Sequence, residues 1–212
     1  MSIFGGKWQE VPPAFMHSQF LNAGNEKEAA LDYLENEGIL DRAKAESLTG
    51  DMNFDDVAKN YLRLHALVSI RARVIGEIPP DTRWNKVQLL VDSDLAKVNV
   101  IASEDRVKKA GPTNELLDYA ARVPQIKLET DPENWAMPIL WGHSQNGPFS
   151  IIEGNNRLVA YAQSGRKGLS IPVCIGISSN LCLWHRPDRP NIPQVKLPGG
   201  SFPLCLMNHM WR

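Results

Sequence analysis

The sequence has no apolar run approaching the ~20 residues that a membrane-spanning helix requires. The stretch from Met1 to Trp8 contains no apolar segment of the signal-peptide type. Only three cysteines are present, an odd number that is typical of reduced thiols in the cytosol and not of a disulfide framework. We therefore expect a cytoplasmic protein with no membrane partner.

An excess of charge of either sign is also missing, because 23 Lys and Arg face 24 Asp and Glu, which gives a formal net charge of −1 at pH 7. Broad, non-specific binding to nucleic acid relies on excess basic residues, so the composition does not support it, although a local basic patch stays open. A hydrophobic content of 43% and a length of 212 residues fit a globular protein with one substantial domain, with or without a small helical appendage.

The motifs of several common enzyme classes are absent from the sequence. It contains no Walker-type Gly-rich loop, no Gly-x-Ser-x-Gly nucleophile elbow and no His-Glu-x-x-His helix. P-loop chemistry and the common hydrolase chemistries therefore have no support from motifs.

The most informative stretch that is present covers residues 149–162, Phe-Ser-Ile-Ile-Glu-Gly-Asn-Asn-Arg-Leu-Val-Ala-Tyr-Ala. It predicts a strand, a tight turn at Gly154 and a helix that ends at Gly165. Because glycine has no Cβ, Gly154 can bring the backbone close to a ligand. The unpaired N–H groups in the first turn of the helix then favour a phosphate.

Arg157, in that first turn, opposes the helix dipole at a cost of roughly 0.3–1 kcal/mol when exposed. A nearby anion would remove the conflict. One candidate is the phosphate of a nucleotide, and the other is Glu153, four residues earlier. In this second interpretation Glu153 and the two asparagines cap the helix, and Arg157 forms a surface ion pair.

Two segments, Ile151–Tyr161 and Ile171-Pro172-Val173-Cys174-Ile175, resemble the core of the ParB/sulfiredoxin superfamily. Members of that superfamily carry an acidic residue or glycine, then Gly-x-x-Arg, at a strand-to-helix turn, followed by a strand that begins Ile-Pro-Val. Residues 137–149 resemble the strand–loop–strand that enters this core. The resemblance covers roughly residues 120–178 and implies an α+β fold with a mixed sheet.

The resemblance also implies a nucleotide site, in which Gly154, Asn155, Asn156 and Arg157 hold the phosphates of ATP or CTP. Glu153 would act as a general base or help to place a Mg²⁺ ion, since phosphoryl transfer depends on positioning and charge neutralisation. Sulfinic-acid reduction is not expected, because Asn155 stands where sulfiredoxins have their cysteine nucleophile. Asn156 stands where kinase-like members have histidine, which leaves its mode of phosphate binding open.

Three functional hypotheses follow. The first is a nucleotide-binding enzyme that performs phosphoryl transfer or nucleotide hydrolysis, with an unknown acceptor. The second is a non-catalytic, nucleotide-gated or DNA-associated module of a plasmid or phage system, whose aromatic arm and apolar tail dock a partner. The third is a nuclease built on the same core.

Further candidate site residues lie outside this turn. His143, in the polar loop 142–147 between two expected strands, is a candidate proton shuttle because an imidazole gains and loses a proton near neutral pH. Asp92 and Asp94 form a candidate cation site, although acids in this pattern more often form turns. Zinc is a candidate at four residues with Cys-x-x-His and Cys-x-x-x-His spacings, for which buried core cysteines are the alternative: Cys182, His185, Cys205 and His209.

The chain divides into four expected parts. Tryptophan and phenylalanine side chains anchor the first part, helices make up the second, and prolines exclude a long helix or central strand from the last. The parts are an irregular N-terminal arm at 1–24, a helical subdomain at 25–83, an α+β domain of ParB/sulfiredoxin type at 84–184 and a Pro-rich tail at 185–212.

Within the helical part, capping and glycine patterns predict helices over 25–37, 41–48 and 53–76. In the third of these, apolar residues recur at steps of three and four, which predicts that they share one face buried in the core. They are Phe54, Val57, Tyr61, Leu64, Val68, Ala72 and Ile75. Later in the chain we expect strands at 86–91, 97–101 and 171–177 and a helix from Thr113 or Asn114 to Arg122.

Overall fold

The computed structural model describes residues 7–23, 25–100, 108–111, 115–126 and 136–180. The helices are α1 (Pro13–Leu21), α2 (Asn25–Asn36), α3 (Arg42–Gly50), α4 (Val57–Gly76), α5 (Val91–Asp94), the 3-10 helix η1 (Leu95–Lys97), α7 (Leu116–Arg122) and α8 (Asn155–Ser164). The strands are β1 (Gln9–Val11), β2 (Arg83–Leu90), β3 (Val98–Asn99), β4 (Ile139–Gly142), β5 (Phe149–Glu153) and β6 (Ser170–Ile177).

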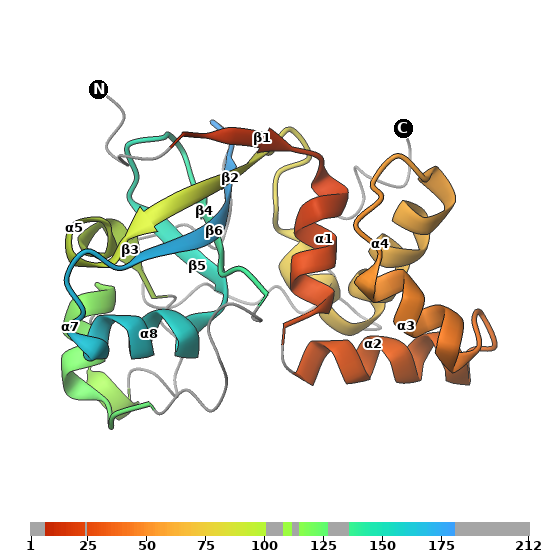
Figure 1. Cartoon of the computed structure of the whole chain (residues 1–212), viewed down its shortest axis with the longest axis horizontal. Coiled ribbons are helices and arrows are strands. Elements are labelled where there is room, and N and C mark those ends of the chain that lie inside the picture. Colours follow the sequence, from red (N-terminus) through yellow and green to blue (C-terminus); the bar gives the residue numbers. More distant parts are fainter. Residues whose placement is uncertain (1–6, 24, 101–107, 112–114, 127–135, 181–212) are drawn as a thin grey trace, which may run out of the picture.

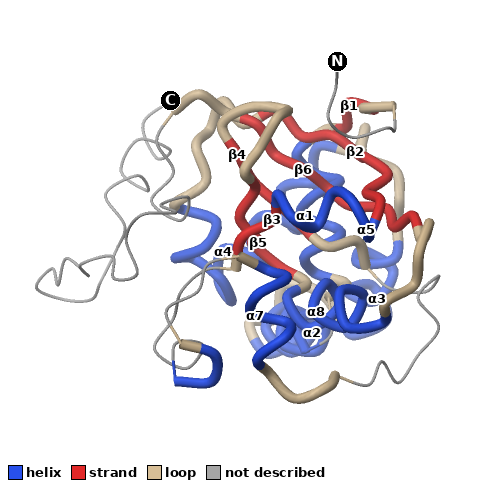
Figure 2. Tube along the Cα trace, turned by 90° about the vertical axis from the view of Figure 1, so that its left-hand side faces the viewer, coloured by secondary structure: helices blue, strands red, loops and turns tan. Residues whose placement is uncertain are grey.

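The described strands form one mixed sheet in the order β1-β2-β6-β4-β5-β3. Strands β1, β2 and β6 pair antiparallel, β4 lies parallel to β6 and antiparallel to β5, and β3 closes the other edge parallel to β5. Figure 2 shows these strands together, with β1 and β2 on one side of β6 and β4, β5 and β3 on the other. The expected α+β class with a mixed sheet is therefore confirmed for the described residues.

Helices cover both faces of the sheet, with α1 to α4 on one side and α5, α7 and α8 on the other (Figure 1). Alternate residues of each strand serve the two cores, because successive side chains of a strand point to opposite faces. In β4, Leu140 belongs to the core under α7 and α8, whereas Ile139 and Trp141 belong to the core under the N-terminal helices. The N-terminal helices thus share their core with the sheet.

The N-terminal arm differs from the irregular segment expected for residues 1–24. Residues 9–11 form the edge strand β1, and residues 13–21 form α1, which starts with a proline at its first position, where no N–H is needed. Phe15 and Phe20 are buried, as expected of anchors, and Trp8 packs against the core on the other face of the sheet. The prediction missed both elements because this segment has no clear apolar periodicity.

The predictions for α2 and α3 are confirmed, with Asp41 accepting a hydrogen bond from Lys44 N at the start of α3 and Gly38 in a left-handed conformation after α2. Strand β6 and the β4–β5 hairpin are confirmed as well. Strand β3 is shorter than expected, and α7 begins at Leu116. The expectations for 101–107, 112–114, 127–135 and 181–212 lie outside the described residues.

Helix α4 buries a different face from the one predicted, although Phe54 and Ile75 of the predicted stripe do pack partly against the N-terminal core. It starts at Val57, after the cap Asp56, and not at Asn53, and the side chains of Val57 and Tyr61 are 80% and 65% exposed. The buried face instead contains Arg63, Ala66 and Leu67. The apolar stripe does lie on one face of the helix, as the periodicity predicts. The periodicity could not show that the face buried in the core is the one that contains an arginine.

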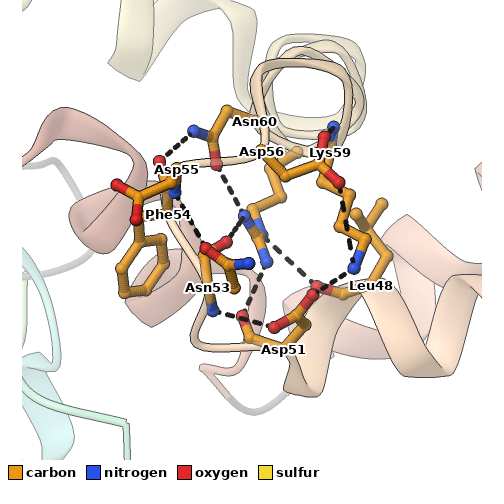
Figure 3. A network of polar contacts seen from close by, with 9 residues as sticks. Leu48, Asp51, Asn53, Phe54, Asp55, Asp56, Lys59 and Asn60 are labelled. Atoms are coloured by element: carbon orange, nitrogen blue, oxygen red, sulfur yellow. Dashed lines mark hydrogen bonds and ion pairs between the residues drawn. The ribbon is translucent and has the colours of Figure 1, made fainter.

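Arg63 is fully buried and holds the loop between α3 and α4. Its Nη2 donates to the carbonyl oxygen of Asp51 at 2.6 Å, and its Nη1 donates to Asn60 Oδ1 at 2.6 Å and to the carbonyl oxygen of Asn53 at 3.3 Å. Its Nε donates to the carbonyl oxygen of Leu48 at 3.3 Å, and these acceptors surround the guanidinium in Figure 3. The ring of Phe54 lies 5.2 Å from the guanidinium carbon. Burial lowers the pKa of Arg63, while Asp51 and Asp56 oppose that shift.

His17 in α1 gives the N-terminal core a pH dependence. Burial and the nearby charge of Arg63 lower its pKa from the ordinary value of 6.5 to about 4, and its Nδ1 is buried without a hydrogen-bond partner among the described residues. The neutral imidazole is therefore favoured in the folded state. The contribution of the neutral His17 to the free energy of unfolding is fully present above pH 6.5. It is lost as the pH falls toward 4, because His17 takes up a proton at a higher pH in the unfolded chain than in the folded one.

We expect the free energy of unfolding to fall by about 3 kcal/mol between pH 7 and pH 4 from His17 alone. Urea unfolding across this range measures it, and His17→Gln, which cannot titrate, should flatten the pH dependence by that amount. Identical pH slopes for the two proteins would contradict a neutral His17 in the folded state.

Candidate functional site

The turn between β5 and α8 has the strand, glycine and helix start that the sequence predicts. Gly154 precedes the helix with φ 94° and ψ 23°, a left-handed conformation that side-chain-bearing residues rarely adopt. No side chain caps the start of α8. The first N–H groups of the helix, from Asn155 onward, are therefore left without the side-chain acceptor that usually satisfies them.

The backbone at Gly154 packs closely against Pro138, the residue just before β4. A Cβ added to Gly154 would lie 2.9 Å from both Cα and Cβ of Pro138 and 3.1 Å from Nη2 of Arg157. The space that the missing Cβ of Gly154 leaves is therefore filled by Pro138. Any ligand at this turn has to approach the helix start and the Arg157 side chain, and not the Cα of Gly154.

Glu153 and Arg157 form the ion pair that their spacing of four residues predicts. Arg157 Nη2 lies 3.6 Å from Glu153 Oε1, and the two side chains are 14% and 28% exposed. The pair is therefore largely enclosed, in contrast to the surface pair of the second interpretation. At 3.6 Å the contact is longer than a good charge-assisted hydrogen bond, which measures about 2.7–2.9 Å.

The second nitrogen of the Arg157 guanidinium, Nη1, is buried and has no hydrogen-bond partner among the described residues. Burial lowers the pKa of Arg157, and the negative charge of Glu153 opposes this shift. An arginine remains protonated in proteins, so the buried Nη1 carries part of a positive charge with no acceptor. Such a group costs free energy until an acceptor reaches it.

The two asparagines of the turn differ in their surroundings. Asn155 Oδ1 is buried without a hydrogen-bond partner in the described part of the chain, and Asn156 is exposed. Neither side chain caps the helix, which the second interpretation requires. Asn155 and Arg157 therefore each bring one buried, unsatisfied polar atom to the first turn of α8, and Asn156 between them is exposed.

His143 lies at the other end of the hairpin from Glu153. Strands β4 and β5 pair Ile139 with Glu153 and Gly142 with Phe149, so His143 follows the end of β4 that is remote from the turn. Four residues of strand separate the two ends, or about 13 Å. His143 packs edge-on against Trp141 at 4.9 Å, and its Nδ1 lies 3.2 Å from the carbonyl oxygen of Ser178. The structure does not bring the two candidate catalytic residues together.

Asp92 and Asp94 have structural contacts, as the more common interpretation predicts. Asp94 Oδ2 accepts from Leu90 N at 2.8 Å, and Asp92 Oδ2 accepts from Gly168 N at 3.2 Å. Within the described ranges no group of three or more His, Cys, Asp or Glu side chains is placed to hold a metal ion. The zinc candidates Cys182, His185, Cys205 and His209 lie outside those ranges.

Cys174 in β6 offers no reactive thiol. It is fully buried in the core on the side of the N-terminal helices, and burial raises the pKa of its thiol well above the ordinary value. A thiolate is the reactive form of cysteine, so a raised pKa makes this residue inert near neutral pH.

Searches against protein-family models, curated proteins and solved structures find no match for the chain. Over the described ranges, no helix has both the length and the apolar composition needed to cross a membrane. The function therefore has to be inferred from the geometry of the β5–α8 turn.

Proposed function

We propose that the β5–α8 turn binds the phosphates of a nucleotide, ATP or CTP, in an enzyme of ParB/sulfiredoxin type that performs phosphoryl transfer or nucleotide hydrolysis. The observation that supports this proposal is the buried, unpartnered Nη1 of Arg157 beside an uncapped helix start. A helix N-terminus and a guanidinium both commonly bind phosphate oxygens in proteins. Their combination at one turn favours an anionic ligand over a purely structural role.

Glu153 defines how the site would change on binding. Its carboxylate is the only anion that forms an ion pair with Arg157 among the described residues. A phosphate oxygen that binds Nη1 and the N–H groups of Asn155 and Asn156 takes over the charge of Arg157. Glu153 is then released from its pair and can accept a proton from an attacking hydroxyl or water.

A Mg²⁺ ion fits the chemistry of this donor set, because carboxylate oxygens are the ligands that Mg²⁺ prefers, together with phosphates and water. As the alternative to the role of general base, Glu153 would hold this ion, and the ion would supply neutralisation of charge on the phosphates. His143 has no step in this proposal, because it lies about 13 Å from Glu153 along the hairpin.

Arg157→Gln is expected to weaken nucleotide binding roughly 10- to 100-fold, since one hydrogen bond to a charged group contributes about 1.5–3 kcal/mol. Isothermal titration with ATP and with CTP, with and without Mg²⁺, measures the change. Arg122→Gln is the matched control, because Arg122 forms an ion pair of the same spacing with Asp118 on α7. Equal affinities for the two variants would exclude Arg157 from the site.

Glu153→Gln separates binding from chemistry. We expect this substitution to lower the turnover rate by about 10²- to 10⁴-fold, which is the usual effect of removing a general base. The affinity for inorganic phosphate should stay equal or rise, because the substitution removes an anion that competes with phosphate for Arg157. Phosphate release and titration with inorganic phosphate measure the two effects, with the exposed Glu10→Gln as control. An unchanged turnover rate would remove Glu153 from the mechanism.

A non-catalytic nucleotide-binding module is the second candidate, because Glu153 is the single described carboxylate at the turn and the second expected catalytic group, His143, lies remote from it. In this case the wild-type protein binds a nucleotide and never consumes it. Incubation with plasmid DNA and Mg²⁺ tests the nuclease hypothesis, and electrophoresis of the DNA gives the result.

A further inference from the structure

Helix α1 is connected to the β5–α8 turn through the side chain of Gln19. Gln19 is 8% exposed, and its Oε1 accepts a hydrogen bond from the backbone N–H of Met137 at 2.9 Å. Met137 directly precedes Pro138, which packs against Gly154 at the turn. Gln19 and Met137 are 118 residues apart in the sequence, so no local pattern predicts this connection.

The hydrogen bond of Gln19 holds a segment that β4 holds only from one side. Pro138 has no backbone N–H, so only its carbonyl group can bond to the sheet, and this carbonyl oxygen accepts from Cys174 N at 2.9 Å. The pairing of β4 begins one residue later, at Ile139. The nearest N–H before Pro138 is that of Met137, which is the group that Gln19 holds. The chain at Pro138 is therefore held by the sheet on one side and by α1 on the other.

Helix α1 is a rigid support for this bond. The side chains of Phe20 and Leu21, which follow Gln19, are buried in the N-terminal core. Figure 1 shows α1 between the sheet and α4, and α1 contacts both. At the C-terminal end of α1, Asn22 Nδ2 donates to the carbonyl oxygen of Thr49 in α3 at 2.7 Å. Close-packed groups have little freedom to shift, so α1 presents the Gln19 acceptor at a fixed place.

Pro138 and the guanidinium of Arg157 border the same small space beside Gly154. A Cβ on Gly154 would lie 2.9 Å from Cα and Cβ of Pro138 and 3.1 Å from Nη2 of Arg157. A displacement of Pro138 therefore changes the space in which the guanidinium lies. Because Nη1 of Arg157 is buried without an acceptor among the described residues, the position of the guanidinium decides where an anion can bind. A displacement of about 1 Å in a site can weaken its action strongly.

We propose that Gln19 is a positioning residue for the guanidinium of Arg157. Its hydrogen bond to Met137 keeps Pro138 against Gly154, and Pro138 in turn limits where the guanidinium can lie. The consequence for phosphate affinity rests on the proposed function, whereas the position of the side chain does not. The helical N-terminal part of the chain thereby supplies a component of the β5–α8 site.

NMR spectroscopy of the full chain without nucleotide tests the position of Arg157. Gln19→Met removes the amide acceptor and keeps the length of the side chain, and we expect it to shift the signals of Gly154 N–H and Arg157 Nε–H. Asn22→Leu is the matched control, because it removes a hydrogen bond of α1 that leads to α3 and away from the turn. Both signals should stay in place in this control. Gln19→Glu keeps an oxygen acceptor and should restore most of the shift.

Isothermal titration with ATP and with CTP, in the presence of Mg²⁺, tests the consequence for binding. We expect Gln19→Met to weaken binding roughly 3- to 30-fold, within the range of coupling between contacting residues. Asn22→Leu should leave the affinity unchanged even where it lowers the unfolding temperature. In the Arg157→Gln background, Gln19→Met should have no further effect, because the group that Gln19 positions is absent.

Three results would each overturn the proposal: unchanged Gly154 and Arg157 signals in Gln19→Met, equal shifts in Asn22→Leu, or a loss of affinity that persists in the Arg157→Gln background. Gln19→Leu also lacks the acceptor and replaces Gln19→Met if that variant does not fold. The NMR result requires no ligand. A wild-type protein that binds neither nucleotide would therefore overturn the proposed function, while the NMR signals still decide the role of Gln19.

Discussion

Replacing Arg63 by alanine is expected to lower the free energy of unfolding by about 3 to 4 kcal/mol, because a buried hydrogen-bond network loses the guanidinium that donates to three backbone carbonyl groups. The carbonyl oxygens of Leu48, Asp51 and Asn53 would lose their bond to the guanidinium, and the loop between α3 and α4 would lose its anchor. The aliphatic stem of Arg63 also packs in the N-terminal core, so the variant leaves a cavity. Urea unfolding measures the loss.

Arg42→Ala is the matched control for this prediction. Arg42 contacts four carboxylates, those of Glu28, Asp32, Glu35 and Glu46, but all of these groups are substantially exposed. Exposed ion pairs contribute little, so the control should lose only a small part of what Arg63→Ala loses. A larger loss at Arg42 than at Arg63 would contradict the assignment of the loop anchor.

Arg63→Lys refines the same experiment. A lysine keeps the positive charge but cannot reach four acceptors in the plane of a guanidinium. We expect it to recover only a minor part of the loss, which shows that the geometry of the donors, and not the charge, holds the loop.

The central part of the fold could be predicted from sequence because its elements have strong local patterns. Strand β6 and the β4–β5 hairpin are rich in β-branched and aromatic residues and contain or adjoin glycine and proline, and α8 lies between two glycines. Such patterns determine an element by themselves. The mixed sheet then follows from the order of the elements.

The face of α4 could not be predicted in the same way, because both faces carry residues that a core accepts. The stripe through Val57 and Tyr61 is apolar but exposed. The buried side chains of the opposite face are those of Ala66, Leu67 and Arg63. The face that turns inward carries the arginine whose donors the carbonyl groups of Leu48, Asp51 and Asn53 require. This requirement is invisible in a pattern of apolar spacing.

The candidate site was predicted in part. The spacing of Glu153 and Arg157 predicted their pair, whereas the contact between Gly154 and Pro138 joins segments sixteen residues apart and has no local pattern. The separation of His143 from Glu153 depends on the register of β4 and β5, which a sequence specifies only through the length of the loop between them.

Gly154→Ala is expected to lower the free energy of unfolding by about 2 to 4 kcal/mol, through two separate causes. A non-glycine residue in the left-handed region costs about 1–2 kcal/mol. The added Cβ would also lie 2.9 Å from Pro138 Cα, a backbone atom that cannot move without shifting β4. Thermal and urea unfolding measure the combined effect.

Gly165→Ala isolates the first cause, because Gly165 follows the same helix with φ 61° and has no atom within 4 Å of an added Cβ. It should show only the cost of the left-handed conformation, so the difference between the two variants gives the contribution of the Pro138 contact. Equal losses at the two glycines would mean that this contact is loose. Because Gly154→Ala disturbs the fold in either case, loss of nucleotide binding in this variant would not locate the ligand. Arg157→Gln, which leaves the backbone of the turn unchanged, tests the phosphate site more directly.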